Sequence, residues 1–228
     1  MKEAVNINLI NSDNAFDFSK IKSVGYYFIK RLFDIVCALI GCLFLLPISL
    51  VVKISYMLSG DFNSIFYTQK RIGQNGKEFN FYKFRSMVPN ADDILIKILS
   101  ENKDLAREYK INKKLKHDPR ITKMGRILRK TSLDELPQLI NVLKGEMAMI
   151  GNRPYLPREK EDMGNHFDMI VKTRPGITGY WQVSGRSDTT FEKRLKLEEY
   201  YSYNASLKMD VKIFFKTFET VLFGKGAE

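Results

Sequence analysis

The stretch IVCALIGCLFLLPISLVV, residues 35–52, decides the fold because it places 18 uncharged residues in a row. As a helix it would be about 27 Å long, close to the roughly 30 Å hydrocarbon core of a bilayer. Pro47 lies inside this stretch. Proline has no N–H to donate to the carbonyl of Leu43 and clashes with that carbonyl, so we expect a kink there.

Basic residues lie on both sides of the apolar stretch: Lys20, Lys22, Lys30 and Arg31 before it, and Lys53, Lys70 and Arg71 after it. A spanning helix usually keeps its basic excess on one side of the membrane. We therefore predict a re-entrant membrane helix over 25–58, bent at Pro47, with both ends on the same face. A buried core helix and a straight single span remain alternatives. A cleaved signal peptide is rejected, because the apolar run starts late and no small-residue cleavage site follows it.

The composition favours an anionic partner. The chain has 228 residues, a net charge of +11 and a pI near 9.5, which suits nucleic acid, an acidic membrane or a phosphorylated ligand. Cys37 and Cys42 would point in different directions on one helix, so we expect them to stay unpaired in a reduced compartment. We expect a loosely ordered tail over 1–24 and one further domain over 59–228.

A β-hairpin is predicted directly after the membrane helix. Alternating segments over 65–72 and 78–85 flank Asn75-Gly76, a strong hairpin-turn signal. Lys83 and Arg85 project from one face of the second strand and precede Ser86. This pair of cations either binds phosphate or lies on a solvated face.

The rest of the domain is predicted to be mainly helical. We expect a long charged helix over 91–116 and a new helix beginning at Asp118-Pro119. Segments 121–130 and 208–222 both carry an apolar face and a basic face. Such helices suit either a domain core or an anionic membrane surface. The predicted fold is therefore α+β and mainly helical, with a β-hairpin and amphipathic interface helices.

Asp134 and Glu135 stand side by side after a run of five basic residues, Arg120, Lys123, Arg126, Arg129 and Lys130. One explanation is a helix cap, because Ser132 and Glu135 match a capping box and acids are stabilised at a helix start. The other is a site for phosphate and a divalent metal. Gly/Pro-rich segments over 151–154 and 174–186 favour the second explanation, because glycines let a backbone approach a diphosphate, although ordinary turns are also rich in glycine.

Six motifs occur in an order that resembles the bacterial sugar transferases, also called monotopic phosphoglycosyl transferases. They are KRLFD at 30–34, KFRSM at 83–87, LDELPQL at 133–139, NVLKGEM at 141–147, RP at 153–154 and PGITG at 175–179. The resemblance runs over about 30–223. It implies an enzyme that transfers a sugar-1-phosphate from a UDP-sugar to undecaprenyl phosphate, releases UMP and initiates polysaccharide or glycoconjugate assembly. It also implies a monotopic protein of the bacterial cytoplasmic membrane, with its catalytic domain in the cytoplasm.

The resemblance also implies roles for single residues. Asp134 would be the nucleophile that forms a covalent phosphosugar intermediate, and Glu135 would bind Mg²⁺, a hard cation that prefers oxygen ligands. Arg153 would lie beside the phosphates or the uridine, with Lys83, Arg85 and Gln182 as weaker candidates. Pro47 would break the membrane helix.

The sequence departs from the family pattern at two positions. Asn152 replaces a usual proline, so we expect a less rigid turn, and Leu46 replaces a serine before Pro47. The chain resembles the short, minimal members of the family.

The competing hypothesis is a membrane-anchored basic protein that binds nucleic acid or acidic lipid. Such a binder has no use for Asp134 among cations, so we expect no nucleic-acid partner. The identity of the sugar and any homo-oligomerisation are left open by the sequence.

Overall fold

The computed structural model describes residues 24–112, 115–184 and 189–222, with side chains as far as 219. Its fold is α+β and mostly helical, as predicted, with two small two-stranded sheets. Residues 1–23, which hold nearly all of the predicted tail, lie outside this description. The elements in chain order are α1 (Val24–Leu58), β1 (Phe66–Ile72), η2 (Gln74–Gly76), β2 (Glu78–Phe84), α2 (Ala91–Glu101), α3 (Lys103–Asn112), α4 (Lys123–Thr131), η3 (Leu133–Glu135), α5 (Gln138–Lys144), β3 (Ala148–Ile150), η4 (Pro157–Glu159), α6 (Lys160–Met163), η5 (Gly164–His166), α7 (Phe167–Ile170), β4 (Gly176–Thr178), α8 (Tyr180–Ser184), α9 (Phe191–Asn204) and α10 (Leu207–Leu222).

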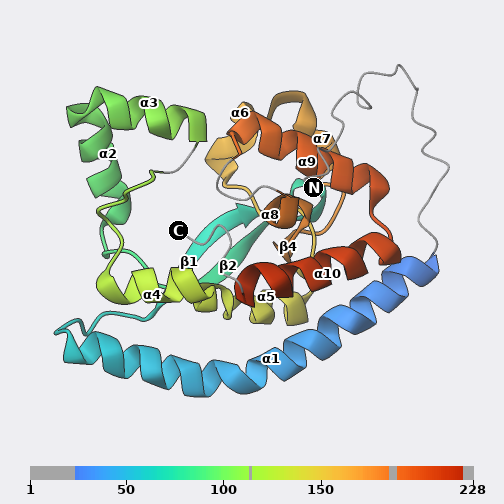
Figure 1. The fold of residues 1–228 in the computed structure, drawn as a ribbon, viewed down its shortest axis with the longest axis horizontal. Helices are drawn as coiled ribbons and strands as arrows, with labels where there is room; N and C mark the ends of the chain where they lie inside the picture. Colours follow the sequence, from blue (N-terminus) through green and yellow to red (C-terminus); the bar gives the residue numbers. More distant parts are fainter. Residues whose placement is uncertain (1–23, 113–114, 185–188, 223–228) are drawn as a thin grey trace.

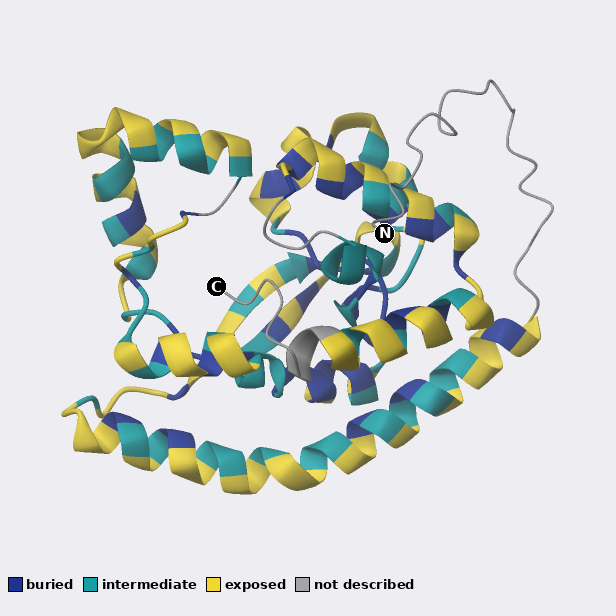
Figure 2. Ribbon diagram, viewed as in Figure 1, coloured by how far each residue is buried: buried dark blue, intermediate teal, exposed yellow. Residues whose placement is uncertain are grey.

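Helix α1 is one continuous helix of 35 residues that passes through Pro47. Figure 1 shows it as a shallow arc beneath the whole domain, and Figure 2 shows exposed positions along its entire length. Its length of about 52 Å exceeds the thickness of a bilayer core. Among the described helices it is the one long and apolar enough to cross a membrane. The re-entrant path and the orientation of its two ends stay predictions.

Three charged side chains near the start of α1 attach it to the domain. The Nζ atom of Lys30 lies 2.8 Å from Asp210 in α10. The guanidinium of Arg31 donates to the last turn of α5, at 2.7 Å to the carbonyl of Val142 and 3.0 Å to that of Leu143. Asp34 is buried and accepts from the backbone N–H of Met149 in β3 at 2.8 Å. Residues 30–34 therefore attach α1 to three separate elements, α10, α5 and β3.

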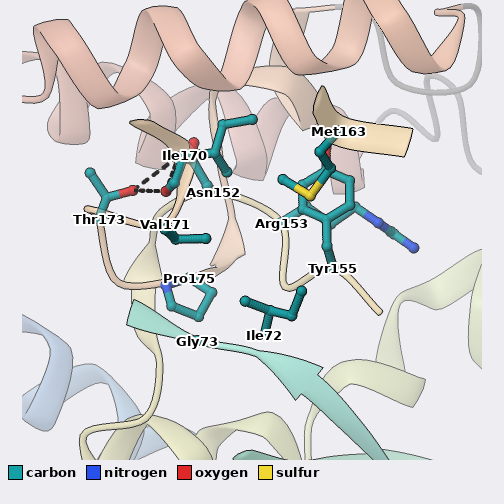
Figure 3. A pocket seen from close by; sticks show the side chains of 10 residues that line it. All are labelled: Ile72, Gly73, Asn152, Arg153, Tyr155, Met163, Ile170, Val171, Thr173 and Pro175. Carbon is teal, nitrogen blue, oxygen red and sulfur yellow. Dashed lines mark hydrogen bonds between the residues drawn. The ribbon is translucent and has the colours of Figure 1, made fainter. Parts of the chain in front are cut away.

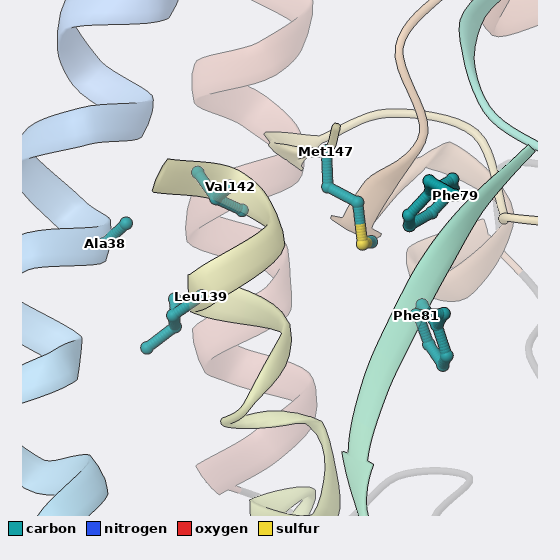
Figure 4. Packing of buried hydrophobic residues seen from close by; sticks show 6 residues of the cluster. All are labelled: Ala38, Phe79, Phe81, Leu139, Val142 and Met147. Carbon is teal, nitrogen blue, oxygen red and sulfur yellow. The ribbon is translucent and has the colours of Figure 1, made fainter. Parts of the chain in front are cut away.

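The core cluster nearest the centre of the domain lies between α1, α5 and β2. Its buried members are Ala38, Phe79, Phe81, Leu139, Val142 and Met147, drawn in Figure 4. Gly41 brings α1 close to α5, because a Cβ added there would lie 2.4 Å from a methyl carbon of Leu139. Helix α5 is thus packed between α1 and the hairpin.

The predicted hairpin is confirmed. Strands β1 and β2 pair in antiparallel fashion, with Phe66 opposite Phe84 and Ile72 opposite Glu78. The connection requires a left-handed backbone, with φ of 57° at Asn75 and 76° at Gly76, which suits these two residue types.

Two predicted helix boundaries are wrong. The helix expected over 91–116 breaks at Asn102, whose side chain accepts from the N–H groups of Asp104 and Leu105 and so begins α3. The helix expected at Asp118-Pro119 begins later, at Lys123, because Asp118 pairs with Arg120 at 2.6 Å. The Thr122 side chain instead accepts from the N–H of Gly125. Local side-chain hydrogen bonds therefore break the first predicted helix and delay the start of the second.

Replacing Gly125 with alanine tests how closely α4 approaches the segment after β2. A Cβ at this position would lie 1.9 Å from the carbonyl oxygen of Ser86, a backbone atom that cannot swing aside. Overpacking of this kind costs about 1–3 kcal/mol and outweighs the helix-propensity gain of about 1 kcal/mol. We expect Gly125→Ala to lower the melting temperature in detergent by about 5 °C.

Gly41→Ala is the matched control, because both glycines are helical but Gly41 faces only the end of the flexible Leu139 side chain. We expect it to change the melting temperature by less than Gly125→Ala does. Equal losses in the two variants would contradict the close approach at Ser86.

Candidate active site

The acidic pair lies on a single 3₁₀ turn, η3, between α4 and α5. Ser132 precedes the turn with a left-handed backbone, φ 58°, and makes no side-chain capping bond, so the expected capping box is wrong. Leu133 and Leu136 share one side of the turn, as i and i+3 do in a 3₁₀ helix, and both pack into the core. This anchoring presents Asp134 and Glu135 together on the other side.

Lys83 bridges the two carboxylates. Its Nζ atom lies 3.3 Å from Oδ2 of Asp134 and 3.1 Å from Oε1 of Glu135. The Asp134 side chain is 8% exposed, whereas that of Glu135 is 35% exposed. The structure therefore joins three of the predicted site residues, with one acid sheltered and its neighbour open to solvent.

Arg129 is a further cation at this end of the site. Its Nε donates to the hydroxyl of Ser86 at 2.9 Å. Burial lowers the pKa of Arg129, and the nearby charge of Asp134 opposes that effect. Arg129 belonged to the basic run that the sequence had indicated, but its closeness to Asp134 depends on the fold.

A strip of cations leads from Lys83 toward Arg153. The ring of Phe81 has Lys83 Nζ at 5.6 Å and the Arg71 guanidinium at 5.2 Å from its centroid. Arg71 then donates to the carbonyl of Pro154, directly after Arg153, at 3.0 Å. Burial, followed by the charge of Arg153, lowers the pKa of Arg71 to about 10. We define these residues, Lys83, Arg71 and Arg153, as the basic strip.

Arg153, which is partly buried, lies beside an aromatic ring and the buried Arg194. Its guanidinium is 5.8 Å from the Trp181 ring centroid, and that of Arg194 is 4.3 Å from the same ring. Among the residues that the structure describes, the buried Nε atoms of Arg71, Arg153 and Arg194 find no hydrogen-bond acceptor. Unsatisfied cationic donors gathered in this way suit an anionic ligand.

Glu198 is the buried acid beside these arginines. It is 1% exposed, and its Oε1 accepts from the backbone N–H of Arg153 at 3.1 Å. Burial raises the pKa of Glu198 to about 7, against the opposing effect of the Arg153 N–H and of the charges on Arg153 and Arg194. This carboxyl thus fixes the turn from which Arg153 projects.

The two glycine-rich segments meet in the small parallel sheet β3–β4. Ala148 pairs with Gly176, and Ile150 pairs with Thr178. A Cβ on Gly151 would lie 2.3 Å from the carbonyl of Arg174, and one on Gly176 would lie 2.1 Å from the backbone nitrogen of Gly151. These glycines permit backbone-to-backbone contact within the protein, which is a structural use of the motif; Gly185 and Arg186 lie outside the described residues.

Asn152 is held firmly, contrary to the looser turn expected from the missing proline. Its Nδ2 lies within hydrogen-bond distance of the carbonyl of Ile170 and the hydroxyls of Thr173 and Ser202, at 3.1, 2.9 and 2.6 Å. Figure 3 shows Asn152, Ile170 and Thr173 on one wall of a small pocket, with the Arg153 guanidinium pointing away from them. Side-chain hydrogen bonds therefore provide the rigidity that a proline ring would supply.

The other two candidates lie apart from this acidic end. Arg85 pairs with Asp61 at 2.8 Å, donates to the carbonyl of Ser64 and stacks on Tyr56 at 4.4 Å, which gives it a structural role at the end of α1. Gln182 lies on α8 beside Trp181, and its buried Oε1 has no partner among the described residues. Their predicted roles in binding stay predictions.

Sequence reasoning missed Arg71, Arg194 and Glu198 as site residues. Arg71 had been counted only as a basic flank of the membrane helix. Glu198 meets Arg153 across 45 positions of the chain. No local pattern indicates such a contact, because the sequence of α9 is that of an ordinary charged helix and does not show which of its charged side chains are buried.

The buried Glu198 carboxyl predicts a pH-dependent stability. Its folded pKa of about 7 lies above the ordinary value of 4.5, so the folded state binds the proton more tightly. The stabilisation is therefore complete below about pH 4.5 and is lost as the pH rises through 7, by up to about 3 kcal/mol. We expect the melting temperature of the wild type, relative to that of Glu198→Gln, to fall by several degrees between pH 5 and pH 8.

The control is Glu192→Gln, an exposed change on the same helix. It should follow the wild type at both pH values. A constant difference between the wild type and Glu198→Gln would contradict the raised pKa.

Comparison with known proteins agrees with the motifs. A family model described as "Bacterial sugar transferase" matches residues 25–224. The undecaprenyl-phosphate galactose phosphotransferase of Salmonella typhimurium is 40% identical over 229 residues, covering 96% of this chain and 48% of that protein. The UDP-galactose-lipid carrier transferase of Erwinia amylovora is 44% identical over 88% of this chain and 42% of its own length.

The chain thus spans about half the length of these two relatives. The exopolysaccharide production protein ExoY of Sinorhizobium fredii is 40% identical over 87% of both chains. With a family model over nearly its whole length and these identities, the chain belongs to the bacterial sugar transferase family.

Proposed function

We propose that the chain transfers a sugar-1-phosphate from a UDP-sugar to undecaprenyl phosphate and releases UMP. The observation that carries this proposal is the sheltered Asp134, bridged to the more open Glu135 by Lys83 at one end of the basic strip. Relatives named for transfer to undecaprenyl phosphate and to a lipid carrier support the choice of acceptor. The product would be the first lipid-linked sugar of a polysaccharide or glycoconjugate.

The proposed reaction has two displacements at one phosphorus atom. A carboxylate oxygen of Asp134 attacks the phosphorus that bears the sugar, the bond to the bridging oxygen breaks, and UMP leaves with that oxygen. An oxygen of undecaprenyl phosphate then attacks the same phosphorus and releases the Asp134 carboxylate. Lys83 and the arginines of the strip offset the negative charge of the phosphates and orient them.

Glu135 is the proposed ligand for Mg²⁺. Among the described residues, no group of three or more His, Cys, Asp or Glu side chains could enclose a metal. Mg²⁺ commonly binds through one or two carboxylates, water and substrate phosphates, so a partly exposed Glu135 beside Asp134 fits such a shared site. When bound, the ion would supply charge neutralisation at the diphosphate.

The exposed apolar surface supports a membrane location. Val211, Phe215 and Phe218 are each more than half exposed along α10, beside the exposed Lys208 and Lys212. Figure 1 places α10 alongside the first half of α1. Apolar side chains flanked by lysines suit the interface of an anionic membrane. We propose a monotopic protein of the cytoplasmic membrane with the site on the cytoplasmic face, where UDP-sugars would be available.

The alternative, a basic binding protein, is disfavoured by the bridged acidic pair. Two carboxylates beside the basic strip would weaken binding of nucleic acid or acidic lipid without any gain. An ordinary glycosyltransferase would release UDP from the donor in place of UMP.

Asp134→Asn tests the covalent mechanism. The amide is isosteric but is a poor nucleophile, so we expect UMP release from UDP-sugars to fall about 10³-fold or more while folding and membrane association persist. The measurement is a UMP-release assay over a UDP-sugar panel with undecaprenyl phosphate and Mg²⁺. Asp104→Asn, an exposed change on α3, should keep full activity. Full turnover by Asp134→Asn would rule out the covalent step, and UDP as product would rule out the reaction class.

Cysteine accessibility tests the re-entrant path. With Cys37 and Cys42 replaced by serine, single cysteines are placed at two exposed positions, Val24 at the start of α1 and Asn63 shortly after its end. We expect an impermeant thiol reagent to label neither position in intact cells and both in inverted membrane vesicles. Labelling of Val24→Cys from outside the cell would show that α1 spans the membrane.

A further inference from the structure

Asn141 is a buried side chain on α5, between the two parts of the acidic end of the site. It is fully buried, at 0% exposure. Helix α5 begins three residues after Glu135, whereas Lys83 lies on β2. Helix and strand pack against each other through the cluster that contains Leu139 and Phe81. Asn141 therefore lies where β2, which carries Lys83, packs against α5, the helix that follows Asp134 and Glu135.

The Asn141 carboxamide binds the free edge of β2. Its Oδ1 accepts from the N–H of Tyr82 at 3.1 Å, and its Nδ2 donates to the carbonyl of Asn80 at 2.7 Å. Strand β2 pairs only with β1 in this two-stranded sheet, so its other edge has no strand partner among the described residues. The carboxamide takes the place of the peptide group that a third strand would offer.

The orientation of this carboxamide follows from its partners. Nδ2 also donates to Oε2 of Glu146 at 2.7 Å. Rotation of the amide by 180° would turn its oxygen toward two acceptors, Asn80 O and Glu146 Oε2, and its NH₂ group toward the N–H of Tyr82. All three contacts thus require asparagine in one orientation, and aspartate cannot reproduce them.

We propose that Asn141 is a positioning residue that sets where Lys83 lies relative to Asp134 and Glu135. The N–H of Tyr82 is one residue before Lys83, so its bond to Asn141 fixes the strand where the lysine side chain leaves it. From there Lys83 reaches both carboxylates, at 3.3 and 3.1 Å. Without Asn141, β2 loses two hydrogen bonds that hold it in register with the helix.

Chemical labelling of Lys83 tests this position without any assay of turnover. Lysines are acylated with limiting acetic anhydride and quantified by mass spectrometry. We expect Asn141→Ala to raise the labelling rate of Lys83 several-fold, because its amine leaves the two carboxylates, and to leave exposed Lys97 unchanged. Asn204→Ala is the control, since Asn204 is exposed and its side chain donates to the carbonyl of Tyr200 in its own helix.

Asn141→Asp is the second variant if the alanine variant does not fold. It keeps the volume of the side chain but places an oxygen against Asn80 O and Glu146, so the same rise at Lys83 is expected. Folding of each variant is checked by its melting transition. Unchanged Lys83 labelling in a folded Asn141 variant would overturn the proposal.

A double-mutant cycle tests the catalytic consequence, which rests on the proposed function. In UMP release, we expect Asn141→Ala to lower kcat roughly tenfold. KM for the UDP-sugar should stay unchanged, because the Arg153 end of the strip is intact. Since Asn141 would act through Lys83, Asn141→Ala added to Lys83→Met should cause no further loss. Losses that multiply would overturn this route of action. A wild type that releases no UMP would refute the proposed function, while the labelling result would still decide the role of Asn141.

Discussion

Charged side chains on an otherwise apolar helix determine how this protein is assembled. Lys30, Arg31 and Asp34 lie within about one and a half turns of α1 and contact α10, α5 and β3. Breaking a buried charged contact of this kind costs several kcal/mol, because the remaining partner stays desolvated. The rest of α1 is therefore free to present apolar side chains outward. Through α5, the same attachment also supports the turn that carries the acidic pair.

The candidate site has two ends with different chemistry. At one end Lys83 offsets two carboxylates, and at the other Arg153 and Arg194 lie on Trp181 with Glu198 buried beneath them. Phe81 and Arg71 connect the ends, so that cations follow one another along the hairpin and the 151–154 turn. An extended anion such as a nucleoside diphosphate matches this spacing of charges better than a compact one. The two ends also differ in their acids, because the carboxylates of Asp134 and Glu135 contact Lys83 at one end, whereas Glu198 is buried beside Arg153 at the other.

Local sequence signals predicted the elements whose causes are local. The Asn75-Gly76 turn predicted the hairpin, and the apolar stretch with its basic flanks predicted α1 as a helix. Family motifs named Lys83, Asp134 and Glu135 as candidate site residues, but the ion pairs that join them are seen only in the structure. Predictions failed where a side chain has more than one possible hydrogen-bond partner: Asp118 pairs with Arg120, and Asn102 caps a new helix. Of the two explanations for the acidic pair, the cap by Ser132 is not formed.

The arrangement around Glu198 and Asn141 could not be predicted from local patterns. Each of these side chains bonds to backbone groups 45 to 61 positions away. Contacts of that range depend on the packing of α5 against β2 and of α9 against the 151–154 turn. The sequence of a helix does not show whether a polar residue faces solvent or the edge of a strand. Only the tertiary structure distinguishes the two cases.

Lys83 also affects whether the turn with the acidic pair can fold before a ligand binds. Two adjacent carboxylates on one short turn repel each other, and this repulsion would oppose folding of the turn before any ligand arrived. The lysine comes from the same chain, 51 residues earlier than Asp134, and so the hairpin is synthesised first. The amine of Lys83 thus offsets the charge of the two carboxylates, and the η3 turn can fold without a metal ion from the cell. The Mg²⁺ ion proposed above would compete with this internal amine for the two carboxylates, which would raise the ion concentration needed for half-occupancy.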